Sequence, residues 1–286
     1  MYKIPPKFKK RFLSFLSWSL ALLTSGILLL MIIFWHYTSD LPNYKQLQAY
    51  EPKIATKIYA GDGQLISYFA TENRAFIPIT FIPQNVIHAF IAAEDKNFYT
   101  HKGVDFYGVI RAILQNVRNV SADRRLVGAS TITQQVAKNF LLTNEVSLER
   151  KIKEAVLAFK IEQTLSKDKI LELYLNEIYL GAGAYGVATA SITYFNKPLD
   201  ALSIDEMAFL AALPKAPNNY NPNTHYQAAL DRRNWVISRM SEDNYLTKDE
   251  ANKAQKKPLT IVSGNLSRFE NASYFTEEVR RYLAEQ

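Results

Sequence analysis

The sequence contains no cysteine and few of the residues that break regular structure. Its 286 residues include 10 Gly and 11 Pro. The lack of cysteine excludes disulfide scaffolds, thiol nucleophiles and cysteine-based zinc sites. The low glycine and proline content excludes a collagen-like chain, and a hydrophobic fraction of 48% excludes a wholly disordered one. The length is typical of one or two domains with substantial cores.

An excess of positive charge is missing from most of the chain. Five of the 34 basic residues lie within residues 1–11, which leaves 29 basic against 27 acidic residues over 12–286. The net charge of +7 therefore belongs mainly to the tail. Because nucleic-acid-binding proteins usually spread basic residues over a binding face, no nucleic-acid partner is expected.

Charge is also absent from one long segment, since residues 12–39 contain no Lys, Arg, Asp or Glu. As a helix, residues 12–35 would rise about 36 Å, enough to cross a hydrocarbon layer of ~30 Å with some tilt. An uncleaved anchor over 12–37 is favoured over a signal peptide, which has a shorter apolar core and a small-residue cleavage site. The preceding basic residues predict a cytoplasmic tail over 1–11 and export of the remainder.

The remainder is predicted to be mainly α with a small β element. Residues 54–70 alternate apolar and polar side chains around Gly61-Asp62-Gly63, which is typical of a β-hairpin. From residue 83 onward, apolar residues recur at helical spacing. Helices are predicted over residues 83–95, 104–118, 131–142, 148–164, 167–180, 203–213, 225–241 and 248–256.

Two glutamates fall on the apolar stripes of their predicted helices. Glu94 lies four residues after Phe90, and Glu154 lies three residues before Leu157. Carboxylates are rarely buried without partners, and burial raises the pKa toward the range that suits a general base. The alternative is a helix end or a surface ion pair, such as Arg150 with Glu154. The pattern alone leaves both interpretations open.

Two further segments concentrate polar groups. Asp95, His101 and Asp105 closely follow Glu94, and an isolated histidine such as His101 more often has a structural role than a metal-binding one. Residues 128–139 open a predicted helix with a capping box, and a helix N-terminus is an anion site, although an ordinary capped helix explains the same pattern. Side chains near that terminus that suit a phosphate or pyrophosphate are Ser130, Thr131, Gln134, Gln135, Lys138, Arg150 and Lys151.

The glycines Gly181, Gly183 and Gly186 match G-x-G-x-x-G, with Asp205 at the distance of a ribose ligand. That fingerprint requires a preceding buried strand, whereas the preceding segment has helical period and carries charges throughout. A tight turn and close helix packing are predicted instead of dinucleotide binding.

Five segments, in order, resemble the motif blocks of the peptidoglycan glycosyltransferase domain, family 51, found in class A penicillin-binding proteins and monofunctional transglycosylases. They are EDKNFYTHKGVD (94–105), GASTITQQVAKN (128–139), RKIKEAVLAFKIE (150–162), ILELYLNEIYLGAGAYGV (170–187) and ALPKAPNNYNP (212–222). The resemblance covers about residues 50–222. It implies a lysozyme-like, mostly helical glycosyltransferase domain preceded by one transmembrane helix.

The resemblance also assigns roles to residues. Glu94 matches the general base, and Glu154 matches a second essential glutamate that orients nearby cations or a divalent metal. Lys96-Asn97 replaces two arginines found in many members. Positions that match those that shape the site or contact substrate are Asp95, Phe98, His101, Thr131, Gln135 and Lys138, and Arg150 and Lys151 match a basic pair near the donor's pyrophosphate. From the polar pattern of the same segment, Ser130 and Gln134 are also expected to bind substrate.

The implied reaction polymerises lipid II into β-1,4 glycan strands by inverting transfer, with release of undecaprenyl pyrophosphate. No obligatory cofactor is expected, and the site is compatible with Mg or Mn. Expected partners are lipid II, the growing glycan chain, membrane lipids and cell-wall synthesis proteins. The alternatives are a membrane-anchored, non-catalytic peptidoglycan-binding scaffold and a glycan hydrolase.

The implied organisation places a juxtamembrane segment with a hairpin at 38–80, the catalytic core at 81–222 and a connector at 223–286. That connector resembles the one that precedes a transpeptidase domain, which favours a truncated bifunctional enzyme over a protein that uses its first domain alone. Ser-x-x-Lys, Ser-x-Asn and Lys-Thr-Gly do not occur together, so no transpeptidase activity is expected. The expected location is the bacterial inner membrane, single-pass, with a cytoplasmic N-terminus and a periplasmic catalytic domain.

Overall fold

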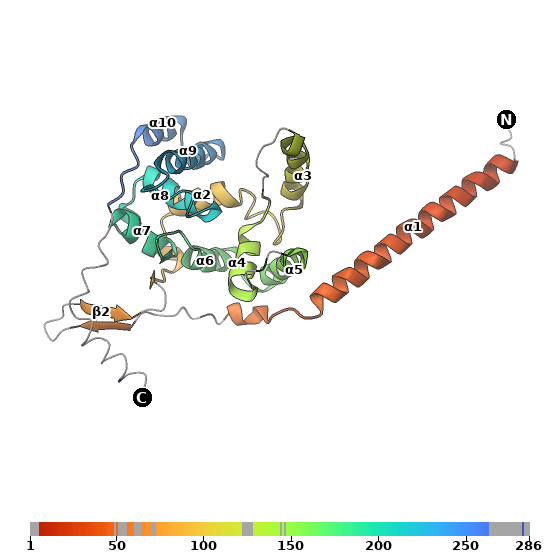
Figure 1. The fold of residues 1–286 in the computed structure, drawn as a ribbon, viewed down its shortest axis with the longest axis horizontal. Coiled ribbons are helices and arrows are strands. Elements are labelled where there is room, and N and C mark those ends of the chain that lie inside the picture. Colours follow the sequence, from red (N-terminus) through yellow and green to blue (C-terminus); the bar gives the residue numbers. More distant parts are fainter. Residues whose placement is uncertain are drawn as a thin grey trace.

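The computed structural model describes residues 6–48, 50, 56–59, 65–69, 73–121, 128–143, 145, 147–262 and 282. This part of the chain is mainly helical with two small sheets (Figure 1), which confirms the predicted class. The helices are α1 (Pro6–Thr38), α2 (Gln84–Glu94), α3 (Phe106–Ser121), α4 (Ile132–Leu141), α5 (Leu148–Thr164), α6 (Lys167–Glu177), α7 (Val187–Phe195), α8 (Ile204–Ala212), α9 (Tyr226–Glu242) and α10 (Lys248–Lys256). Short 3-10 turns are η1 (Tyr44–Leu47), η2 (Ile79–Phe81), η3 (Leu199–Ala201) and η4 (Leu213–Lys215).

The strands form one antiparallel and one parallel pair. Strand β1 (Thr56–Tyr59) pairs antiparallel with β2 (Leu65–Phe69), as the hairpin pattern predicts. The predicted turn glycines of that hairpin lie outside the described residues. Strand β3 (Asn73–Arg74) pairs in parallel with β4 (Ala184–Tyr185), which joins the segment before α2 to the segment after α6.

The core is built around α2, α6 and α8, which are buried over most of their length. Residues 170–176 of α6 are all buried, as are residues 207–212 of α8. A helix that is buried on most of its sides must be covered by several other elements. Helix α8 packs against α2 and α9, and α4 packs against α5 and α6.

All eight predicted helices are present, and their ends differ from the predicted ones by three residues or fewer. Helix α7 was not predicted. It is nine residues long, contains β-branched and aromatic residues, and begins at Gly186 without a side-chain cap. Its local signals are therefore weak, and packing of its buried residues, such as Tyr194 and Phe195, decides its conformation.

The glycine-rich segment after α6 is a tight turn, as predicted. Gly181, Gly183 and Gly186 have φ values of 84°, 71° and 78°. A Cβ on Gly186 would lie 2.6 Å from the carbonyl oxygen of Asn176 at the end of α6. Only glycine combines this left-handed backbone with such a close approach.

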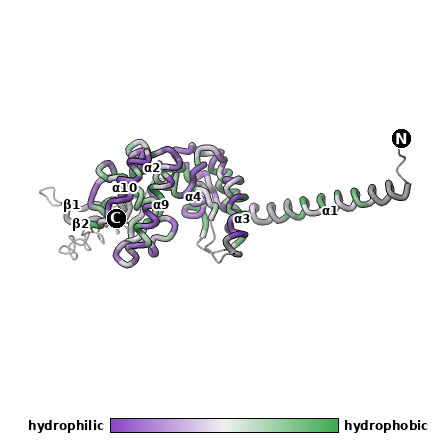
Figure 2. Tube along the Cα trace, turned by 90° about the horizontal axis from the view of Figure 1, so that it is seen from above, coloured by the Kyte–Doolittle hydropathy of each residue, from purple (hydrophilic) through white to green (hydrophobic). Residues whose placement is uncertain are grey.

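Helix α1 projects from the helical body (Figures 1 and 2), and its large apolar side chains, including Phe15, Trp18 and Leu22, are exposed. Among the described residues, none of the helices has the combination of length and apolarity that a membrane crossing requires. The transmembrane anchor predicted over residues 12–37 is therefore not confirmed.

The core continues beyond residue 222. Helix α9 packs against α8 and α2, and α10 packs against α9 and α8. Val236, Ile237 and Met240 of α9 are completely buried, and they belong to the same apolar cluster as α2. The helices of the predicted connector thus share a core with the helices that precede them.

Candidate functional site

Glu94 is the last residue of α2, a helix whose apolar residues are mostly buried. Its Oε2 accepts a hydrogen bond of 2.8 Å from Nε2 of Gln135 on α4. The residue as a whole is partly exposed, yet desolvation of its carboxyl group raises the pKa of Glu94. The Gln135 hydrogen bond and the charges of Arg232 and Lys215 act in the opposite direction. The negative end of the α2 dipole also disfavours a carboxylate there.

Asp95 joins the end of α2 to the start of α4. Its Oδ2 lies 2.9 Å from the backbone nitrogen of Ile132, which donates to it, and 2.9 Å from Nε2 of His101. The backbone N–H of Gly103 donates to Nδ1 of His101 over 3.1 Å. Because Nδ1 is an acceptor, the proton of the neutral imidazole is on Nε2 and faces Asp95. His101 is therefore held in place by hydrogen bonds to the Asp95 carboxylate and from the Gly103 backbone.

The predicted capping box at the start of α4 is confirmed. Thr131 accepts from the backbone of Gln134, while Oε1 of Gln134 accepts from the backbone of Thr131 over 3.0 Å. The Thr131 hydroxyl also donates to the carbonyl oxygen of Gly103 over 2.6 Å. Both side chains thus fix the helix start against the loop that follows Asp95.

Glu154 lies on α5 with 1% of its side chain exposed. Nζ of Lys151 is 2.6 Å from its Oε2 and also donates to Oγ of Ser130 over 2.9 Å. Nε of Arg150 is 3.2 Å from Oε1, but these two buried atoms lack hydrogen-bond geometry with any described group. The ion pair with Arg150 exists, as one interpretation of the sequence held, but its acidic partner is buried rather than on the surface.

Lys138, in the last turn of α4, connects the two glutamates electrostatically. Desolvation is the largest influence and lowers the pKa of Lys138. Glu154 and Glu94 both raise that pKa, whereas Arg150 and Lys151 lower it. The Lys138 ammonium thus lies in the field of both carboxylates, which are 60 residues apart in sequence and belong to different helices.

The loop after Glu94 is held by its own packing. Phe98 is completely buried, and Nζ of Lys167 lies 4.5 Å from the centre of its ring. The same ammonium donates to the carbonyl oxygen of His101 over 2.8 Å. Nδ2 of Asn97 donates to Asp105 over 2.8 Å. These contacts make Phe98 part of the support under the loop.

Three residues near Glu94 were not predicted: Tyr174, Lys215 and Arg232. The hydroxyl of Tyr174 is buried without a hydrogen-bond partner among the described residues, and burial raises its pKa well above the ordinary value. Lys215 lies in the fifth motif block and Arg232 in the predicted connector. A basic residue on a partly apolar helix is the only local signal for Arg232, and its neighbour Arg233 has the same signal.

Among the described residues, the donor set forms no site that would hold a divalent metal through protein ligands alone. Within the described ranges, no three His, Asp or Glu side chains converge as metal ligands would. Glu154 is already paired with two cations, and Asp95 is hydrogen-bonded to His101 and the α4 backbone. No step of the reaction is therefore assigned to a metal.

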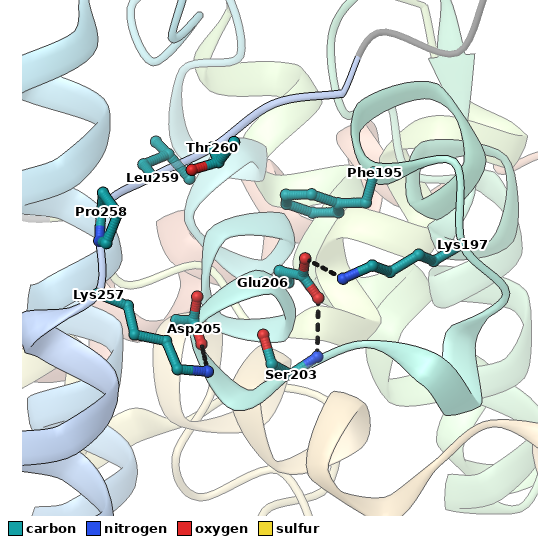
Figure 3. Close-up of a pocket in the computed structure, with 9 residues that line it drawn as sticks. All are labelled: Phe195, Lys197, Ser203, Asp205, Glu206, Lys257, Pro258, Leu259 and Thr260. Atoms are coloured by element: carbon teal, nitrogen blue, oxygen red, sulfur yellow. Dashed lines mark hydrogen bonds and ion pairs between the residues drawn. The ribbon is translucent and has the colours of Figure 1, made fainter.

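A cavity of about 340 Å³ lies elsewhere, between α7, α8 and the segment after α10 (Figure 3). Nζ of Lys197 is 2.7 Å from Glu206, and Nζ of Lys257 is 2.9 Å from Asp205. Its lining includes none of the predicted site residues. The charged groups that line the cavity thus form two ion pairs with one another.

Known proteins match this chain over most of its length. The family model described as Transglycosylase matches residues 62–241. Penicillin-binding protein 1A of Rickettsia conorii is 52% identical over 248 residues, or 87% of this chain and 31% of that protein. Penicillin-binding protein 1A of Aquifex aeolicus is 47% identical over 90% of this chain and 34% of that protein.

Among solved structures, penicillin-binding protein 1A from Haemophilus influenzae is 29% identical, covers 82% of this chain and 25% of that one, and has a TM-score of 0.46. The chain spans about a third of the length of the curated relatives it matches. The predicted resemblance is confirmed by the family model and by these relatives. The chain belongs to the transglycosylase family, a family of peptidoglycan glycosyltransferases.

Proposed function

We propose that the chain polymerises lipid II into β-1,4 glycan strands and releases undecaprenyl pyrophosphate. The observation that carries this proposal is a desolvated carboxyl group, Glu94, in the same neighbourhood as a cation, Lys138, that lies in the field of both Glu94 and buried Glu154. A base and an anion-stabilising group in one neighbourhood are what a glycosyl transfer to a sugar hydroxyl needs.

In the proposed reaction Glu94 accepts the proton of the 4-hydroxyl of the GlcNAc of lipid II. The hydroxyl oxygen forms a bond to the anomeric carbon of the growing chain, and the bond from that carbon to the pyrophosphate oxygen breaks. A raised pKa makes Glu94 a stronger base, and Gln135 orients the carboxylate through Oε2, which leaves Oε1 for the acceptor. Such proton transfer contributes typically 10²–10⁴-fold to a rate.

The negative charge that develops on the leaving pyrophosphate would be met by Lys138, Arg150 and Lys151. Lys138 forms no ion pair within 4.0 Å among the described residues, and Nε of Arg150 is buried without a hydrogen-bond acceptor. Glu154 holds the other two cations in place and has no room to act as a nucleophile between them. An inverting displacement also requires no enzyme nucleophile.

The test is incubation of the purified protein with labelled lipid II in detergent. Polymer is expected from the wild-type chain and none from Glu94→Gln. The matched control is Glu149→Gln, because Glu149 lies on α5 with about half of its side chain exposed in a pair with Lys153. Binding of lipid II without polymer would establish the scaffold instead, and release of soluble fragments from sacculi would establish a hydrolase.

The lysozyme-like character of the fold and the location of the enzyme are part of the same proposal. We place the catalytic helices at the periplasmic face of the inner membrane, with residues 1–11 in the cytoplasm. The charge-free run over 12–39 supports this placement. A second support is an exposed apolar face on α3 that suits contact with lipid: Phe106, Tyr107, Ile110, Ile113, Leu114 and Val117.

Topology is tested separately from activity. A reporter that is active only in the periplasm is fused after residue 60 of the full N-terminal segment. Activity of this fusion is expected, and activity of a cytoplasmic reporter at the same position would overturn the placement.

A further inference from the structure

Helix α9 carries two adjacent arginines, Arg232 and Arg233, whose surroundings differ completely. Arg233 is 0% exposed. Its guanidinium donates to Oδ1 of Asn234 over 2.8 and 3.1 Å, and to the carbonyl oxygen of Gln255 on α10 over 3.1 Å. Arg233 therefore ties α9 to α10 and is a structural residue.

Arg232 makes no such tie. Its guanidinium carbon lies 3.9 Å from the centre of the Trp235 ring, one turn further along α9. Its Nε is buried and has no hydrogen-bond partner among the described residues. Stacking on an indole fixes the plane of a guanidinium while leaving its N–H groups unused. Arg232 is thus held in a defined orientation without being neutralised.

The position of α9 relative to Glu94 is fixed on both sides of that residue. His88 on α2 stacks on Tyr245, which follows α9, with ring centres 4.1 Å apart. Nζ of Lys96 lies 2.5 Å from Oδ1 of Asp243 at the end of α9. These contacts flank Glu94 in sequence and join the end of α2 to the C-terminal end of α9, and the two helices also pack against each other.

The charged and titratable groups that act on Glu94 come from five places. Asp95 is on its own element, Lys138 on α4, Tyr174 on α6, Lys215 on η4 and Arg232 on α9. Among the cations that lower the pKa of Glu94, Arg232 has the largest effect, ahead of Lys215. No ion pair within 4.0 Å joins Glu94 to Arg232 in the described structure, so the interaction acts through space and leaves Oε1 of Glu94 available, while Oε2 accepts from Gln135.

We propose that Arg232 is a positioning residue for the Glu94 carboxylate, a fixed positive charge that keeps this group ionised and ready to accept the proton of the acceptor hydroxyl. The inference rests on the proposed function, in which Glu94 is the general base. It assigns a role in the site to a helix that lies beyond the five motif blocks. Desolvation and the charge of Arg232 then oppose one another, so that Glu94 is basic enough to react and still ionised near neutral pH.

The test compares the pH dependence of kcat/KM for lipid II polymerisation in three variants. Removal of a nearby positive charge makes a carboxylate harder to ionise. In a plot of kcat/KM against pH, the acidic limb is the part where kcat/KM falls as Glu94 becomes protonated. Arg232→Gln is therefore expected to move this acidic limb to higher pH, with a loss of kcat/KM several-fold larger at about pH 5.5 than at about pH 8. Arg232→Lys keeps the charge and is expected to restore the limb to near its wild-type position.

The matched control is Arg233→Gln on the same helix. It is expected to lower the melting temperature, because it leaves Asn234 and the α10 carbonyl without a partner, and to leave the acidic limb in place. An acidic limb that stays unchanged in Arg232→Gln, or that moves equally in both Gln variants, would overturn the proposal.

A readout that does not depend on turnover separates this inference from the proposed function. The carboxyl resonance of Glu94 is followed by ¹³C NMR against pH and assigned by its absence in Glu94→Gln. Its titration is expected to move to higher pH in Arg232→Gln and not in Arg233→Gln. If the wild-type chain makes no polymer, the proposed function fails; if the Glu94 titration ignores Arg232, this inference fails.

Discussion

Replacement of Glu154 by glutamine tests how much the buried charge of this residue stabilises the fold. The substitution keeps the shape of the side chain but removes its charge. In the structure that charge is 1% exposed and lies 2.6 Å from Nζ of Lys151 and 3.2 Å from Nε of Arg150. Glu154→Gln therefore leaves two cations beside a neutral group.

The size of the destabilisation follows from how much water those cations regain. Removal of one partner from a fully buried ion pair costs about 3–5 kcal/mol. The side chains of Arg150 and Lys151 are 16% and 48% exposed, so solvent compensates a large part of that loss. We expect a decrease of about 1–2 kcal/mol in the free energy of unfolding. For a domain of this size that is a fall in Tm of roughly 2–8 °C.

The assay is thermal unfolding by circular dichroism, with Glu149→Gln as the control on the same helix. Glu149 pairs with Lys153 at 2.8 Å, and its own side chain is 51% exposed, so its loss is expected to change Tm by less than the experimental scatter. A Glu154→Gln variant as stable as wild type, or more stable, would refute the reasoning, because the two cations would then gain nothing from Glu154.

Three further outcomes follow from other parts of the site. Burial raises the pKa of Glu94 above 4.5, so the folded state binds the Glu94 proton more tightly than the unfolded state does, and the ionised carboxylate destabilises the fold at higher pH. Glu94→Gln should therefore raise Tm at about pH 8, and the difference should vanish below about pH 4. A lower Tm of the variant at about pH 8 would contradict this. Asp95→Ala leaves the N–H of Ile132 unpaired and should lower the free energy of unfolding in urea by about 1–3 kcal/mol. A variant that is fully active and as stable as wild type would contradict this. Gly186→Ala places a methyl group 2.6 Å from the Asn176 carbonyl oxygen at a φ of 78°, so the Tm of this variant is expected to fall. A soluble variant with unchanged Tm would show that this turn is not constrained.

Most of the helical framework was predictable because its signals are local. The capping box Thr131-x-x-Gln134 marks the start of α4 in the sequence and in the structure. The spacing of Glu94 after Phe90 and of Glu154 before Leu157 predicts inward-facing carboxylates, and the desolvation of Glu94 and burial of Glu154 agree with that. These features depend on neighbours within one or two helical turns, which a periodic pattern reports directly.

Other features depend on residues far apart in sequence. The Gln135 to Glu94 hydrogen bond spans 41 residues, and the packing that brings Arg232 toward α2 spans more than 130. Nothing near Arg232 in the sequence distinguishes it from Arg233, although Arg232 stacks on Trp235 whereas Arg233 donates hydrogen bonds to Asn234 and to α10. Helix α7 likewise depends on the elements that cover it rather than on its own caps.

The amino-acid sequence by itself determined which segments are helical, where several of them begin, and which carboxylates are placed on apolar faces, because backbone propensity, capping and periodicity are short-range effects. Only the tertiary structure decided which cations act on which carboxylate, that Glu154 is paired and buried, and that α9 belongs to the same core as Glu94. The physical reason is that desolvation and Coulomb interactions depend on distance in space, and chain packing sets that distance independently of separation along the sequence.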